Sequence, residues 1–139
     1  MALSAKARKR LEAALARRSE ATEISNLVDD LDLRATAVVA DPGTGAAIPV
    51  TRSASIAITT AAAETNTLAI PTFLGQRLSL CLDVRVGGDR VITSAARINT
   101  AGNTVITMNT AGDAIILEAI KIGGALRWQV VVNDGCTLS

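Results

Sequence analysis

The sequence contains no histidine and no tyrosine, and its only aromatic side chains are one phenylalanine and one tryptophan. Histidine is the commonest general base, and it activates the nucleophile in Ser–His and Cys–His pairs, so both kinds of catalytic site are excluded. Zinc sites with imidazole ligands are excluded for the same reason. No supported nucleophile is left, and we expect a protein that is not an enzyme.

Phosphate-binding and acidic-site motifs are also missing or weak. The sequence has no Walker-type Gly-Lys-Ser/Thr motif, and its glycine-rich stretch Asp41–Gly45 leads into a β-type segment instead of a helix N-terminus. Asp29, Asp30 and Asp32 form the one acidic cluster, which we interpret as a solvated helix face. We therefore predict no catalytic, cofactor-binding or metal-binding residues, and no cofactor.

Long apolar runs are absent. Polar or turn residues interrupt every apolar run well before the roughly 20 residues that span a membrane, and no apolar segment follows the basic N-terminus as in a secretory signal. The formal net charge is only +1, so no global charge points to nucleic acid or a membrane surface. We expect no membrane partner, and a chain that stays in the cytoplasm where it is made or leaves inside a larger particle.

The two cysteines, Cys81 and Cys136, lack the spacing of a metal site. We favour two buried or half-buried thiols, with a disulfide that ties the C-terminus to a strand as the alternative. The lone tryptophan, Trp128, is interpreted as a core residue in preference to an interface anchor. Because apolar residues make up 49% of the chain but aromatics only 1%, the core must consist mainly of small aliphatic side chains. Such a core buries less area per residue, which favours oligomerisation.

Two short helices are predicted before residue 34. Apolar residues recur every three or four positions in each helix, one from about Ser4 to Arg18 and one from about Thr22 onward. Leu15 and Ile24 are nine residues apart, so the two stripes lie half a turn out of phase and require a break between the helices. The apolar positions are Leu3, Ala7, Leu11, Ala14 and Leu15 in the first helix and Ile24, Leu27, Val28 and Leu31 in the second.

This N-terminal segment is also the most basic part of the chain, with six lysines and arginines in its first twenty residues. It lacks the interleaved aromatics of a single-strand binder and any recognised DNA-reading motif, so protein docking is favoured, with plain solubility as the alternative ahead of nucleic-acid binding. We predict that residues 1–33 anchor or oligomerise the protein, with docking through Arg8, Arg10, Leu11 and Leu15.

Residues 34–139 are predicted to form an all-β domain, a sandwich or barrel-like fold, because many short β-type segments alternate with turns. The fold class is thus mainly β with a short helical segment in front. Alternation is clearest around Ile56 and Ile58 and in the stretch where Leu78, Leu80, Leu82 and Val84 should share one face. We expect strands near residues 36–40, 47–51, 54–59, 66–70, 77–84, 89–95, 103–107, 113–121 and 126–132.

A short sequence recurs once: Asn-Thr-Ala-Gly stands at 99–102 and again at 109–112. A β-helix would explain it as a repeat, but such folds need at least three repeats. We favour two similar turns in a meander.

Several stretches of the β domain resemble the β domain of tailed-bacteriophage head fibre and capsid decoration (cement) proteins. The stretches are Ala40-Asp41-Pro42-Gly43, Ile48-Pro49-Val50-Thr51-Arg52-Ser53, the run Ala63–Gln76 (Ala-Glu-Thr-Asn-Thr-Leu-Ala-Ile-Pro-Thr-Phe-Leu-Gly-Gln), Leu126-Arg127-Trp128 and Val132-Asn133-Asp134-Gly135. They consist of structural and turn residues and carry no catalytic signature.

The resemblance implies a virion structural protein on the outside of a phage capsid, assembled in the host cytoplasm. Its partner would be the major capsid protein, and a homotrimer is the favoured assembly. It would stabilise the shell or display an adhesive surface. A tail or baseplate protein that binds a host receptor or glycan is the alternative within the virion, and a cytoplasmic nucleic-acid-binding protein is a third class.

Overall fold

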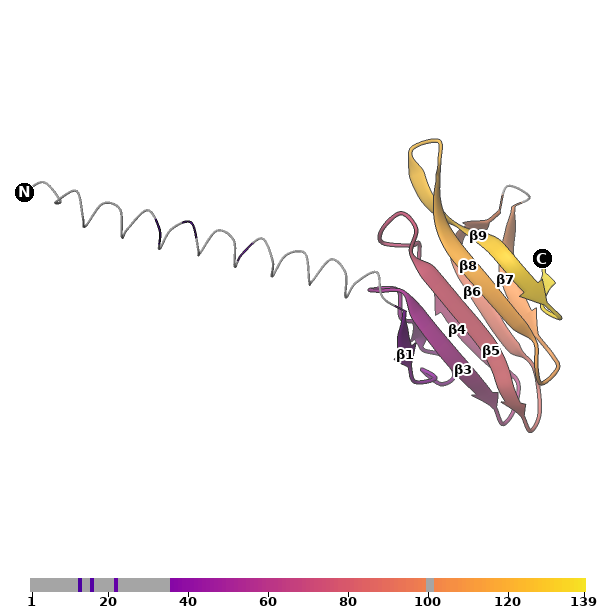
Figure 1. Ribbon diagram of the computed structural model, residues 1–139. Coiled ribbons are helices and arrows are strands. Elements are labelled where there is room, and N and C mark those ends of the chain that lie inside the picture. The colour runs from indigo at the N-terminus through magenta and orange to yellow at the C-terminus, as the bar shows by residue number, and fades with distance from the viewer. Residues whose placement is uncertain (1–12, 14–15, 17–21, 23–35, 100–101) are drawn as a thin grey trace, which may run out of the picture. The chain divides into compact units, whose positions relative to one another are not determined.

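The computed structural model describes Ala13, Ala16, Thr22 and residues 36–99 and 102–139. Residues from 36 onward form a mainly β domain whose two five-stranded mixed sheets pack as a sandwich, which confirms the predicted fold class. One sheet has the strand order β1-β3-β5-β8-β9 and the other β10-β7-β6-β4-β2. Figure 1 shows β3, β5 and β8 side by side in one layer, with β4 and β6 behind them.

The first six strands wind as a coil that alternates between the two sheets. They are β1 (Ala37–Val39), β2 (Ala47–Ile48), β3 (Ala54–Thr60), β4 (Glu64–Leu68), β5 (Arg77–Arg85) and β6 (Arg90–Ile98). Because every second strand runs the same way, β1, β3 and β5 pair in parallel in one sheet, and β2, β4 and β6 do so in the other.

The last four strands complete each sheet with antiparallel pairs: β7 pairs with β6 and β10 in one sheet, and β8 pairs with β5 and β9 in the other. They are β7 (Asn103–Met108), β8 (Ala114–Ile122), β9 (Ala125–Asp134) and β10 (Thr137–Leu138). The sequence predicted every strand but β10, whose two residues are too few to show an alternating pattern.

The core lies between the sheets and is almost entirely aliphatic, as the composition required. Trp128 is 1% exposed, which confirms its interpretation as a core residue. The buried apolar residues are Ile48, Ala54, Ile56, Ile58, Leu68, Leu78, Leu80, Leu82, Ile92, Ile98, Ile106, Met108, Ile115, Leu117, Ala119, Trp128 and Cys136.

Two local expectations are wrong. Val84 does not share the buried face of Leu78, Leu80 and Leu82, because a bulge in β5 inserts Asp83 between the partners of Ile58 and Thr59 and leaves Val84 43% exposed. The second Asn-Thr-Ala-Gly turn does not belong to a meander either, since it joins β7 to β8 in the opposite sheet.

Both predicted N-terminal helices, with Arg8, Arg10, Leu11 and Leu15, lie outside the described residues apart from Ala13, Ala16 and Thr22. Within the described part of the chain, no helix has the length and apolar character needed to cross a membrane.

Candidate functional site

Charged residues of the β domain are separated along the strand direction. β3, β5 and β9 start at one end of the sandwich, here called the basic end, and β4, β6 and β8 return to it from the opposite, acidic end. Among the described residues, the acidic end holds six carboxylates, Asp41, Glu64, Asp83, Asp89, Asp113 and Asp134, with two cations, Arg85 and Arg90. The basic end holds five cations from the same described part of the chain, Arg52, Arg77, Arg97, Lys121 and Arg127, with one carboxylate, Glu118.

A buried ion network closes the acidic end, and Arg90 is its centre. The Arg90 side chain is fully buried, and its Nη2 lies 2.8 Å from Asp41 Oδ2 and 3.1 Å from Glu64 Oε2. Nη2 also donates to the carbonyl of Thr59 at 3.1 Å, and Nη1 donates to Asn66 Oδ1. Two carboxylates on one guanidinium balance the cost of burying its charge.

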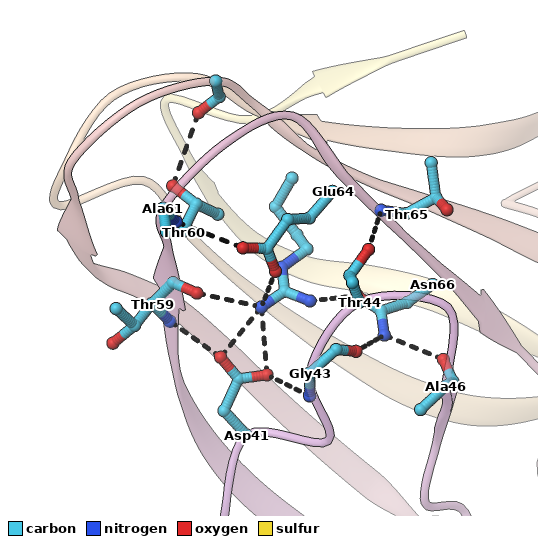
Figure 2. A network of polar contacts seen from close by, with 12 residues as sticks. Asp41, Gly43, Thr44, Ala46, Thr59, Thr60, Ala61, Glu64, Thr65 and Asn66 are labelled. Carbon is cyan, nitrogen blue, oxygen red and sulfur yellow. Dashed lines mark hydrogen bonds and ion pairs between the residues drawn. The ribbon is translucent and has the colours of Figure 1, made fainter.

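The partners of Arg90 fix the surrounding chain in turn (Figure 2). Asp41 accepts from the backbone N–H groups of Gly43 and Thr59, at 3.0 and 2.8 Å. Asn66 donates to the carbonyls of Gly43 and Ala46, at 2.7 and 2.8 Å. The network therefore ties the β1–β2 connection to β3, β4 and β6, and its role is structural. Arg90 Nε has no hydrogen-bond partner among the described residues.

The basic end carries a loop that links β4 to β5, residues 69–76, and a buried glutamine holds this loop in place. Gln76 is 1% exposed, and its amide group donates to the carbonyls of Val50 and Arg52 at 2.7 and 3.0 Å. Its amide oxygen accepts from the N–H of Thr72 at 2.8 Å. Trp128 Nε1 adds a bond of 2.8 Å to the Ala69 carbonyl, so both halves of the loop are anchored.

This anchored loop exposes apolar side chains. Ile70 is 52% exposed and Leu74 59%, although both are large aliphatic residues. Arg77 follows the loop directly and pairs with Glu118 at 2.9 Å on the exposed sheet surface. Arg97, Lys121 and Arg127 form no ion pair with any described residue. The basic end thus combines exposed aliphatic side chains with uncompensated positive charge.

The two cysteines are free thiols, Cys81 half-buried and Cys136 buried, which confirms the favoured interpretation over a disulfide. Burial raises the pKa of the Cys136 thiol to about 11, with smaller contributions from the charges of Asp113 and Asp134. Because thiol reactivity follows thiolate character, Cys136 is a poor nucleophile at neutral pH.

Metal ligation finds no support in the described part of the chain, where no three or more acidic or cysteine side chains are placed to hold an ion. The sequence analysis missed Arg90 and Gln76. A signal for Arg90 exists in the alternation of β6, where it occupies the same inward positions as Ile92 and Ser94. No such signal marks Gln76, which stands in the loop before β5.

The sequence matches no model of a known protein family, and no curated protein is similar to it.

Proposed function

We propose that this chain is a non-enzymatic virion structural protein that decorates the outside of a bacteriophage capsid. In this proposal residues 1–33 attach or oligomerise the chain, through Arg8, Arg10, Leu11 and Leu15, and the β domain lies on the shell, as part of a homotrimer. An interface that spans neighbouring capsid subunits exists only in the assembled shell, so binding stabilises the shell by mass action.

One observation carries the proposal: the sequence stretches that resemble head fibre and decoration proteins contact one another in the folded domain. Gln76 at the end of the run Ala63–Gln76 bonds to Val50 and Arg52 in a second such stretch. Trp128, from a third stretch, bonds to Ala69 in the first. Residues far apart in sequence thus build one rigid end of the sandwich, which supports reading the resemblance as a likeness of a whole domain.

Co-sedimentation of the full chain with phage shells prepared without it tests the proposal. We expect the chain to pellet with the shells at a fixed ratio to the capsid subunit, and the decorated shells to dissociate at a higher temperature. A chain that stays in the supernatant at micromolar concentration would refute capsid decoration. Binding to isolated tails or to immobilised glycans, without binding to shells, would favour the receptor-binding alternative.

A further inference from the structure

The basic end of the sandwich has the composition of a protein-docking surface. Protein interfaces typically join an apolar centre to a polar rim enriched in arginine. Here Ile70 and Leu74 supply exposed aliphatic area. The hydrogen bonds of Ala119 with Gly75 and Gln76 place the loop beside β8, which carries Lys121, and the bond from Trp128 to Ala69 places it beside β9, which carries Arg127.

The loop is also preorganised, which lowers the entropy cost of binding. The Gly75 N–H donates to the Ala119 carbonyl at 2.9 Å, and the Ala119 N–H donates to the Gln76 carbonyl at 2.8 Å. Together with the side-chain bonds of Gln76 and Trp128, these contacts hold the loop against three other parts of the domain. Ile70 and Leu74 are therefore presented from fixed backbone.

The charge distribution selects the partner. Arg97, Lys121 and Arg127 form no ion pair with any described residue, so the basic end is complementary to an acidic surface, whereas the carboxylate-rich opposite end of the described domain would be repelled by it. Phosphates or sulfates alone would leave Ile70 and Leu74 without a role. The ring of Trp128 is buried, so this side chain cannot stack on a base.

We propose that the basic end of the β domain, centred on Ile70, Leu74, Lys121 and Arg127, is a docking surface for an acidic, partly apolar protein surface. This proposal rests on the proposed function and identifies that partner surface with the capsid shell. It assigns binding to the β domain itself, in addition to the contacts predicted for residues 1–33.

Paired substitutions at the two ends of the full chain test the proposal. Arg127→Glu reverses a charge at the basic end, and Arg85→Glu makes the same change at the acidic end. Leu74→Ser removes an exposed aliphatic side chain, and Val86→Ser does so at the acidic end, where Val86 is 76% exposed. The Arg85–Asp89 pair that the control breaks is exposed, and such pairs contribute little to stability.

Affinity for phage shells prepared without the chain is measured by co-sedimentation at low and at physiological salt. We expect Arg127→Glu and Leu74→Ser each to weaken binding about tenfold, as for a residue that contributes measurably to an interface, while both acidic-end controls bind like the unmodified chain. The Arg127→Glu variant should also lose part of the salt dependence. Far-ultraviolet circular dichroism and unfolding curves confirm that all four variants fold.

Three results would overturn the proposal in distinguishable ways. If the unmodified chain binds shells and the basic-end variants bind equally well, the docking surface is wrong but capsid decoration stands. If the unmodified chain does not bind shells, both proposals fall. The third result is that Arg127→Glu leaves shell binding unchanged but abolishes another interaction. Loss of self-association in sedimentation velocity would mean that the surface binds a second copy of the chain. Loss of binding to DNA fragments in gel shifts would mean that it binds nucleic acid.

Discussion

Single buried polar residues hold together the connections at each end of this sandwich, and Arg90 is the clearest example. Its inward position in β6 followed from alternation, but a charged residue there contradicts the apolar pattern, so the sequence alone did not identify it. Its partners Asp41 and Glu64 lie 49 and 26 positions earlier in the printed sequence. Only the coil of β1 to β6 brings all three together.

Replacement of Arg90 by alanine should destabilise the domain strongly. The change leaves Asp41 and Glu64 close together at the acidic end without their cation, and breaking one partner of a buried ion pair costs about 3–5 kcal/mol. The matched control is Arg77→Ala, which removes an exposed ion pair and should cost less than about 1 kcal/mol. Urea unfolding followed by Trp128 fluorescence measures both, and equal costs would contradict a structural role for the network.

The raised pKa of Cys136 predicts a dependence of stability on alkaline pH. The folded chain keeps the thiol protonated up to about pH 11, whereas in the unfolded chain it ionises near 9.0. Between these values the unfolded state binds fewer protons, so this contribution is fully present below pH 9 and is lost as the pH rises towards 11. Cys136→Ala should flatten the pH dependence of the free energy of unfolding in this window. An identical pH profile for Cys136→Ala would contradict the assignment.

At the scale of elements, strand positions were predictable and strand pairing was not. Alternation in β3 and β5, with glycine-containing turns between segments, located nearly every strand. Which strands pair in parallel depends on which of the two sheets each strand joins. The alternation of apolar and polar residues along a strand does not indicate that sheet. The two Asn-Thr-Ala-Gly sequences illustrate the limit. The first stands between β6 and β7, which pair within one sheet, whereas the second stands between β7 and β8, which belong to different sheets.

Gly88 in the β5–β6 connection tests how tightly the acidic-end turns pack. Its φ is +69°, and a Cβ there would lie 2.0 Å from the backbone N of Ala63 in the neighbouring turn. Gly88→Ala should therefore cost several kcal/mol, because both the backbone conformation and a rigid neighbour oppose it. Gly124→Ala is the control, since Gly124 also has a positive φ of +87° but nothing within 4 Å. The difference between the unfolding free energies of the two variants measures the cost of the clash with Ala63. If Gly88→Ala destabilises the domain no more than Gly124→Ala does, the close packing of the two turns is refuted.

For the molecule as a whole, the separation of charge is the property that the sequence concealed most completely. The β domain carries as many carboxylates as cations, so its net charge indicates nothing. The polarity appears only when strand direction is known, because charges near the starts of β4 and β6 fall at the opposite end from those near the starts of β5 and β9. The predicted docking residues Arg8, Arg10, Leu11 and Leu15 lie outside the described residues, and their role stays a prediction.

Electron cryomicroscopy of phage particles with and without this chain would show where the chain lies on the virion. We expect β-sandwich density on the outside of the shell that is present only with the chain, bridges neighbouring capsid subunits and contacts them with the basic end of the domain. Density on the tail or baseplate, or identical particles in both samples, would contradict it.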